Sequence, residues 1–268
     1  MSTETQLGTA ELQGRLWTVN AANWAELHEQ YTQPAYVAAL DALGVGEGTR
    51  LLDIGCGAGL ALQLAVARGA DASGLDASPG LLEYARRRAP DATIVQGELQ
   101  SLPFPDDTFD AVTGFNSFQY AADPIEALRE AKRVTARGGR ILALVWSPAE
   151  MCELAPHLQS LGALMPPPPP GAAGPFALCG RDALEDFFGT AGLEVDEVND
   201  VPCMFAYPDT DTAIAALSSA GPVVQIAEHA GWDAVRADIE AFLAGHVRQD
   251  GTYAIHNPFR YAMSKPVA

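Results

Sequence analysis

The length, composition and charge of the chain exclude several classes of protein. A chain of 268 residues, 48% of them hydrophobic, suits one large globular domain, and its polar start and the lack of a run of about 18 apolar residues argue against a secretory signal and a membrane span. The net charge of −18 argues against a nucleic-acid substrate, because phosphate backbones are bound by clustered Lys and Arg.

The four cysteines are scattered along the chain and form no C-x-x-C pair. Their spacing fits neither a zinc site nor a disulfide framework. We therefore expect reduced thiols, a cytoplasmic location and no metal.

The first part of the chain alternates helical and strand-like patterns. Trp24, Leu27 and Tyr31 share one face of a predicted helix over residues 21–43. Predicted strands follow at residues 50–54, 72–76, 92–96, 110–114 and 140–146. Predicted helices lie between them at residues 61–68 and 78–88 and from Asp123 to the Gly138-Gly139 pair. We interpret the Arg86–Arg88 triplet as a solvated helix end. The alternation predicts parallel strands in a doubly wound α/β sheet.

The later part of the chain has a different pattern. The prolines at 166–170 cannot form a helix or a central strand, so they predict an extended surface loop. A helix is predicted at residues 181–190, a strand at 193–198, and further helices near 212–219 and at 232–244. A last β-like segment follows Gly251, with Tyr253 and Ile255 and later Phe259, Tyr261 and Met263 in alternation.

The segment Leu51–Gly59 is the most informative part of the sequence. An apolar strand runs into Gly55, Gly57 and Gly59, and a helix follows. Glycine permits tight turns and close approach to a ligand, and a helix N-terminus suits a carboxylate or phosphate. About 20 residues later a second strand ends in Asp76, where an acidic side chain can bind ribose hydroxyls. These features predict a nucleotide-type ligand at the carboxyl ends of the strands.

The spacing of the glycines distinguishes between two kinds of ligand. The nicotinamide fingerprint is G-x-G-x-x-G, and its third glycine would fall on Leu60. The observed pattern is G-x-G-x-G, which favours an adenosyl amino acid over a pyrophosphate.

Together these segments resemble the class I S-adenosylmethionine-dependent methyltransferases, in particular the ubiquinone and menaquinone biosynthesis branch. The matching segments are Leu51–Gly59, Gly74–Ser78, Gln96–Leu99, Leu102–Asp110 and Gly138–Arg140. The resemblance implies a seven-stranded, mostly parallel Rossmann-like sheet with N-terminal helices and a helical lid insertion. We accordingly expect an N-terminal cap at 1–44, a core at 45–206 and 248–268, and a lid at 207–247.

The resemblance also implies a cofactor and the residues that bind it. The cofactor would be S-adenosylmethionine, with S-adenosylhomocysteine as its product. The expected binding residues are Asp53, Gly55, Gly57, Gly59, Asp76, Ala77, Glu98, Leu99, Phe115, Asn116 and Gln119. Among them, Asp76 would hold the ribose and Leu99 would donate its backbone N–H to the adenine. Glu98 stands where the family usually has Asp, so its contact with the adenine amine is less secure. Core packing is the alternative role for Phe115.

The expected reaction is an in-line methyl transfer to a small-molecule acceptor, in which the protein mainly aligns the reactants. A general base is needed only for an acceptor with a proton of high pKa. The candidates are His28, Tyr31 and His256, and a structural role is the alternative for each. We predict that residues 21–43, 151–175 and 207–246 enclose an apolar pocket with Trp24, Tyr31, Tyr207 and His256 in its wall.

Other interpretations stay open at this level. The helices at 207–246 could instead form the interface of a homodimer. Two rival functions are a nicotinamide-dependent oxidoreductase, which Leu60 disfavours, and a protein that binds the same cofactor without methylating, either to catalyse a rearrangement or as a binding module. The sequence does not identify the acceptor or the methylated atom.

Overall fold

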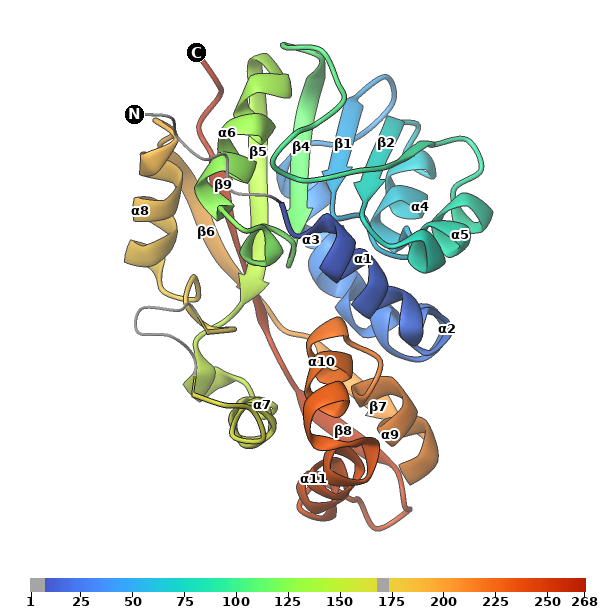
Figure 1. The fold of residues 1–268 in the computed structure, drawn as a ribbon. Helices are drawn as coiled ribbons and strands as arrows, with labels where there is room; N and C mark the ends of the chain where they lie inside the picture. Colours follow the sequence, from blue (N-terminus) through green and yellow to red (C-terminus); the bar gives the residue numbers. More distant parts are fainter. Residues whose placement is uncertain (1–7, 168–173) are drawn as a thin grey trace.

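A single sheet organises the part of the chain that the computed structural model describes, residues 8–167 and 174–268. Its strands lie in the order β3-β2-β1-β4-β5-β9-β6 (Figure 1). Their bounds are β1 Arg50–Ile54, β2 Asp71–Asp76, β3 Thr93–Gln96, β4 Phe109–Phe115, β5 Thr135–Trp146, β6 Val195–Val201 and β9 Phe259–Ser264. The first five run parallel, and β9 runs antiparallel to both β5 and β6. The predicted seven-stranded, mostly parallel Rossmann-like sheet is confirmed.

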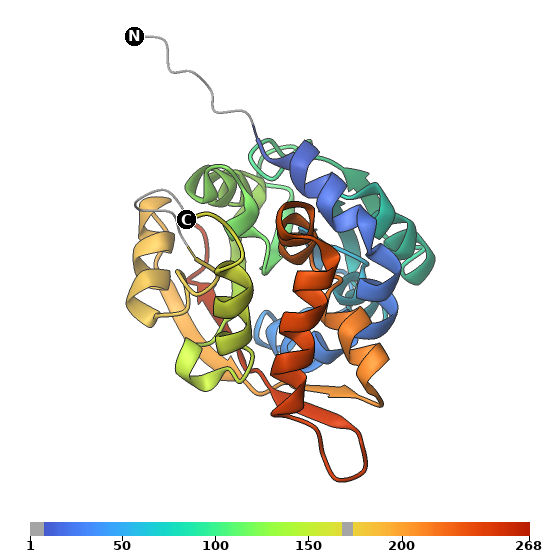
Figure 2. The same ribbon diagram turned by 60° about the horizontal axis from the view of Figure 1, so that its bottom comes forward.

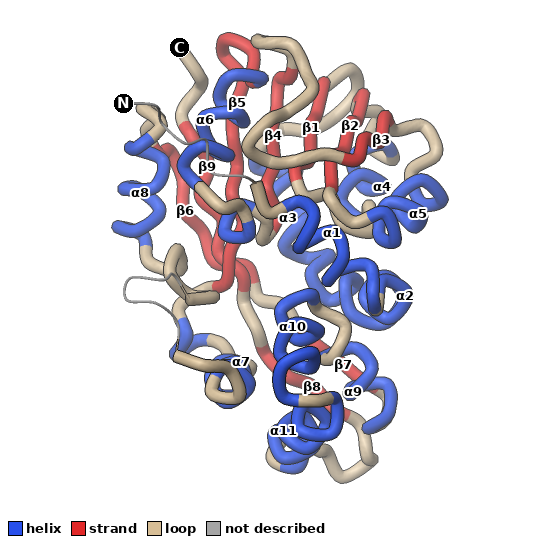
Figure 3. Tube along the Cα trace, viewed as in Figure 1, coloured by secondary structure: helices blue, strands red, loops and turns tan. Residues whose placement is uncertain are grey.

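Helices cover both faces of this sheet (Figure 3). One face packs against α3, α4 and α5, and the other against α6 and α8. Alternating side chains of one strand serve the two layers, since Ala111 faces the first and Val112 the second. The helices of these layers are α3 Gln33–Ala42, α4 Leu60–Val66, α5 Pro79–Arg88, α6 Pro124–Val134 and α8 Arg181–Thr190.

The remaining elements lie beyond the carboxyl ends of the parallel strands (Figure 1). The N-terminal ones are α1 Ala10–Val19, α2 Ala21–Asn23, a π-helical turn Trp24–His28 and a 3-10 turn Glu29–Thr32. The others, which we call the lower layer, are α7 Ala155–Gly162, β7 Met204–Tyr207, α9 Thr210–Leu217, α10 Gly221–Ala230, α11 Trp232–Ala244 and β8 Tyr253–His256. Viewed from below, α10 and α11 lie between α1 and α7 (Figure 2).

Apart from α7, which follows β5 in the chain, the lower layer leaves and re-enters the main sheet at one point. Val201, the last residue of β6, is paired with Phe259, the first residue of β9. Between them the chain leaves the sheet and forms a separate two-stranded sheet of β7 and β8. The predicted single β-like segment after Gly251 is therefore two strands in two sheets. The division into cap, core and lid remains a prediction.

Several predicted element boundaries were wrong. The helical pattern at 21–43 is broken into four short elements. The helix that begins at Asp123 ends at Val134, because residues 135–139 already belong to β5, where the backbone of Gly138 and Gly139 pairs with Val267. The predictions did not include α1, α7, β7 or α10. The proline run lies partly outside the described residues.

Arg88 corrects the interpretation of the arginine triplet. Its guanidinium turns inward from the end of α5, pairs with the carboxylate of Glu29 and donates to the carbonyls of Ala25 and Ala58. One charged side chain therefore ties the π-helical turn to the glycine loop and to α5. A sequence triplet does not reveal such a partner, which lies 59 positions away.

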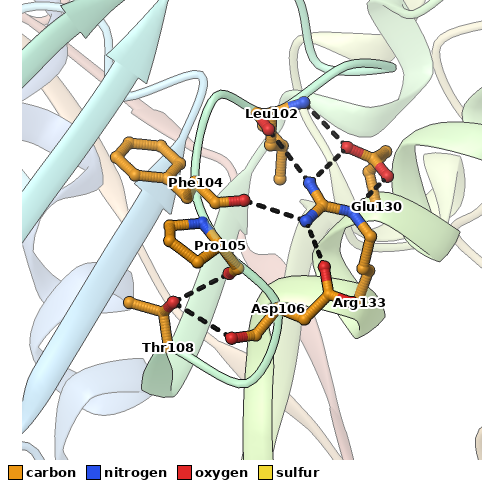
Figure 4. Close-up of polar contacts among 7 residues, drawn as sticks. All are labelled: Leu102, Phe104, Pro105, Asp106, Thr108, Glu130 and Arg133. Carbon is orange, nitrogen blue, oxygen red and sulfur yellow. Dashed lines mark hydrogen bonds and ion pairs between the residues drawn. The ribbon is translucent and has the colours of Figure 1, made fainter.

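Arg133 fixes the long connection between β3 and β4 (Figure 4). Its guanidinium donates to the carbonyls of Leu102 and Phe104 at 2.9 and 2.8 Å and to the carboxylates of Asp106 and Glu130 at 2.7–2.8 Å. Glu130 in turn accepts the backbone N–H of Leu102 at 2.8 Å. The charged bonds hold the loop that follows Glu98 and Leu99, both of which are predicted site residues.

No helix within residues 8–167 and 174–268 is long and apolar enough to cross a membrane.

Candidate functional site

One cavity lies between the carboxyl ends of the strands, the N-terminal helices and the lower layer. Most of the predicted cofactor-binding residues line it. These are Asp53, Gly55, Gly57, Asp76, Ala77, Glu98, Leu99, Phe115 and Asn116. Gly59 and Gln119 lie just behind its wall: Gly59 packs against α5, and Gln119 donates to the side chain of Asn116 at 3.3 Å.

The three positions of the loop require glycine for different physical reasons. All have positive φ, at 75°, 53° and 82° for Gly55, Gly57 and Gly59. A Cβ on Gly59 would lie 2.7 Å from the Cα of Ala85, and one on Gly55 would lie 2.4 Å from the Cβ of Ser117, so packing also requires glycine at these positions. A Cβ on Gly57 would clash with nothing: it would make ordinary contacts with Glu29 at 3.6 Å and Trp24 at 3.9 Å, both of which line the cavity.

Asp76 at the end of β2 holds the loop in this shape. Its two carboxylate oxygens accept the backbone N–H groups of Gly57 and Ser78, each at 2.8 Å. Burial raises the pKa of Asp76, and these backbone donors lower it. The carboxylate thus stands at the cavity wall with its position fixed by two neighbouring backbone groups.

Two further carboxylates are buried near the loop. Asp53 accepts a hydrogen bond from the Thr113 hydroxyl at 2.8 Å, and burial raises its pKa to about 7. Burial also raises the pKa of Glu29 to about 7, even with the Arg88 guanidinium beside it. Sequence reasoning missed Glu29. Arg88 balances the charge of Glu29, so Asp53 and Asp76 are the carboxyl groups here that a cationic ligand would hold in their charged form.

Helix α1 lies against the cavity beside Glu98. Glu98 accepts the backbone N–H of Ala10 at 2.8 Å, so its carboxylate caps the start of α1. Gln13 and Trp17 of the same helix line the cavity. The Trp17 ring meets those of Trp24 and Tyr120 edge-on, with centroids 4.8 and 5.7 Å apart.

Three buried side-chain oxygens have no hydrogen-bond partner in the described part of the chain: Gln13 Oε1, Ser117 Oγ and Gln119 Oε1. Gln13 and Ser117 line the cavity. Buried polar atoms are usually paired, so these atoms fit a site that receives a polar ligand. Asn116, which also lines the cavity, has a left-handed backbone with φ of 51°, which is uncommon outside glycine and concentrates at functional sites.

The rest of the cavity has a mostly apolar wall. It consists of Trp24, His28, Tyr36, Phe115, Trp146, Leu154, His157, Leu158, Leu161, Leu217, Ala220, Val223 and Phe259. The lower layer supplies leucines from α7 and residues of α9 and α10. Trp146 was not among the predicted site residues, although it is the last residue of β5 just as Phe115 is the last residue of β4.

Some of the predicted bases and wall residues line the cavity, and others lie outside it. His28 lines the cavity, with Nδ1 3.2 Å from the Tyr207 hydroxyl, and burial lowers its pKa to about 4. Tyr207 is buried behind it. Tyr31 donates to the carbonyl of Ala206, and its ring packs against Tyr207. The backbone of His256 donates to Glu153 at 2.6 Å. Tyr31, Tyr207 and His256 are not among the residues that line this cavity.

His157 was given no role by the sequence, yet it lines the cavity. Its Nδ1 lies 2.7 Å from the carboxylate of Asp238 on α11. Burial lowers the pKa of His157, and the neighbouring Asp238 opposes that shift. The two residues are 81 positions apart, so no local pattern could have paired them.

Comparison with known proteins agrees with this geometry. Residues 52–143 match the family model described as a methyltransferase domain. A demethylmenaquinone methyltransferase of Renibacterium salmoninarum is 37% identical over 108 residues, which are 40% of this chain and 46% of that protein. The chain thus spans about half the length of this curated relative.

Two solved structures have similar folds over nearly the whole chain. The [4+2]-cyclase SpnF is 20% identical, with a TM-score of 0.61 over 97% of this chain and 95% of its own. The geranyl diphosphate C-methyltransferase of Streptomyces coelicolor A3(2), solved with Mg²⁺, geranyl diphosphate and S-adenosyl-L-homocysteine, is 14% identical, with a TM-score of 0.58 over 99% and 100%. At these identities the likeness establishes the fold alone. Residues 52–143 therefore form a methyltransferase-like domain, similar in sequence to part of the demethylmenaquinone methyltransferase.

Proposed function

We propose that the protein transfers a methyl group from S-adenosylmethionine to a small, uncharged acceptor. The observation that carries this proposal is that one cavity joins the glycine-loop side to an apolar chamber walled by the lower layer. Cofactor and acceptor would therefore meet inside a single enclosure, which is what a direct transfer requires.

The residues present fit the proposed cofactor. Asp76 would accept hydrogen bonds from the ribose hydroxyls. Ala77, Leu99 and the aromatic rings around Trp17 would surround the adenine. Asp53 and Asp76 would face the ammonium and sulfonium charges at the other end, which favour the charged form of both carboxyl groups. S-Adenosylmethionine supplies a methyl group already activated by the charge on its sulfur. The chain's own task is then to orient the acceptor and to exclude water.

The charge of the cavity wall favours an uncharged acceptor. Four carboxylates line the cavity, and none of the described lining residues is Lys or Arg. Phosphate and carboxylate groups are bound by such cations, so an acceptor that carries an anionic group is disfavoured. We propose that the segment 207–247 acts as the lid over this acceptor, because Leu217, Ala220 and Val223 lie in the chamber wall.

Thermal unfolding in the presence of ligands tests the cofactor. At about 100-fold over its dissociation constant, S-adenosylmethionine or S-adenosylhomocysteine should add about 2.7 kcal/mol of stability, or roughly 5–10 °C in Tm. NAD should give no shift. A shift with NAD and none with either sulfur compound would overturn the proposal.

Product analysis then separates transfer from the alternative of a protein that binds the cofactor without methylating. A methyltransferase must form one S-adenosylhomocysteine per methylated acceptor. Binding of both sulfur compounds with no such product across a panel of uncharged hydroxylated aromatics would favour the alternative.

A further inference from the structure

His157 is a polar group set into the apolar chamber. Leu154, Leu158 and Leu161 of its own helix line the wall beside it, and the ring stacks on Phe242 at 4.8 Å with 20° between the planes. Only 3% of His157 is exposed. An apolar chamber with a few placed polar groups is typical of a site that orients a small molecule.

The partner of His157 fixes which ring nitrogen carries the proton. The carboxylate of Asp238 accepts from Nδ1 at 2.7 Å and also accepts the Ser160 hydroxyl on its other oxygen. A carboxylate only accepts, so Nδ1 must hold the hydrogen. In the neutral ring Nε2 then carries a free lone pair, and within the described residues it makes no hydrogen bond.

We propose that His157 Nε2 accepts the hydrogen bond, and then the proton, of a hydroxyl group on the acceptor, and that Asp238 is a positioning residue that sets the tautomer. This inference rests on the proposed function and narrows its acceptor to an apolar body with one acidic hydroxyl, such as a phenol or an enol. The step balances: the oxygen gives its proton to Nε2 and takes the methyl group, the positive charge passes from sulfur to the imidazole, and the ring later releases the proton to water.

The other histidine in the wall is less suited to this role. His28 is paired through Nδ1 with the hydroxyl of Tyr207, which can either donate or accept, so its tautomer is not fixed. It also stands beside Trp24, with ring centroids 4.9 Å apart, rather than among the leucines that would hold the acceptor. An aspartate behind the ring, as at His157, orients the imidazole and stabilises its protonated form.

Binding of two naphthalene probes to the full chain, saturated with S-adenosylhomocysteine, tests the inference. The probes are 2-naphthol, which carries the hydroxyl, and 2-methoxynaphthalene, which lacks its proton. In His157→Asn the amide can still donate to Asp238, but no ring nitrogen faces the chamber. We expect 2-naphthol to bind about fivefold or more weakly to this variant, a factor in the range of one hydrogen bond, and 2-methoxynaphthalene to bind as before.

The controls separate this inference from the proposed function. His229→Asn is the same change on an exposed face of α10 and should alter neither affinity. S-Adenosylhomocysteine should bind equally to all three proteins. Absent or unchanged binding of 2-naphthol, or an equal loss for both probes, overturns the role of His157. Failure of the parent protein to bind S-adenosylhomocysteine would instead overturn the proposed function.

The positioning role of Asp238 has its own readout. In ¹⁵N-histidine-labelled protein, the His157 ring should show hydrogen on Nδ1. In Asp238→Asn, whose amide can donate or accept, part of the population should carry it on Nε2, with a parallel loss of 2-naphthol affinity. Asp238→Glu should restore the Nδ1 form. An unchanged tautomer and unchanged affinity in Asp238→Asn would show that Asp238 only supports the packing of α7 on α11.

Discussion

The two ends of the cavity are built in different ways. At the glycine-loop end, carboxylates fix the shape by binding backbone N–H groups: Asp76 holds those of Gly57 and Ser78, and Glu98 holds that of Ala10. At the acceptor end, side chains from the N-terminal turn, α7, α9 and α10 meet only after the chain has folded. The first end depends on hydrogen bonds to the backbone, and the second on the packing of side chains.

Asp76→Ala tests the backbone-built end most directly and should have the largest effect. Two hydrogen bonds to a charged group are worth about 1.5–3 kcal/mol each, so affinity for S-adenosylhomocysteine should fall well beyond tenfold. Calorimetric titration of the folded variant measures it, with Asp71→Ala at the exposed start of the same strand as control. Unchanged affinity would remove Asp76 from the site.

Substitution of two glycines separates packing from backbone conformation. Gly59 and Gly138 both have φ of 82°, but a Cβ on Gly59 would meet Ala85 at 2.7 Å and one on Gly138 would meet nothing within 4 Å. Gly138→Ala should cost about 1–2 kcal/mol, and Gly59→Ala about 1–3 kcal/mol more. Urea unfolding gives both values. Equal losses would mean that the close approach of the loop to α5 has no energetic weight.

The buried carboxylate of Asp53 should make stability depend on pH. Burial raises its pKa to about 7 from 3.8, so its contribution to stability is fully present below pH 3.8 and is lost as the pH rises through about 7. Asp53→Asn should therefore lose less stability than the parent as the pH rises from 3.8 to about 7, by up to a few kcal/mol. The test is urea unfolding without ligand. Parallel pH profiles of the two proteins would contradict the shift.

Tyr207→Phe examines the acceptor end and should have the smallest effect. It removes only the hydroxyl that lies 3.2 Å from His28 Nδ1 and leaves the buried ring in place. We expect a loss of about 0.5–1.5 kcal/mol in unfolding free energy and no change in cofactor affinity, because this contact belongs to the side-chain-built end. A clear loss of cofactor affinity would show that the two ends are not independent.

The difference between the ends also explains what the sequence could predict. The glycine spacing, Asp76 and the strand alternation are local signals, so the sheet and most of the glycine-loop side followed from them. Glu29 and Arg88, or His157 and Asp238, are paired across 59 and 81 positions, and no local pattern connects them. Tyr31 and Tyr207 were predicted to line the cavity because they are aromatic, but in the structure they pack against other side chains outside its wall.

The pairing of Val201 with Phe259 determines how freely the segment between β6 and β9 can change in length. The 57 residues between these two positions leave and re-enter the main sheet side by side. Their number can therefore change without shifting the register of any strand, and each doubling of such a closed segment costs only about 0.6 kcal/mol of chain entropy. The main sheet can therefore keep its strand order while the segment between β6 and β9 is replaced by one of another length or sequence.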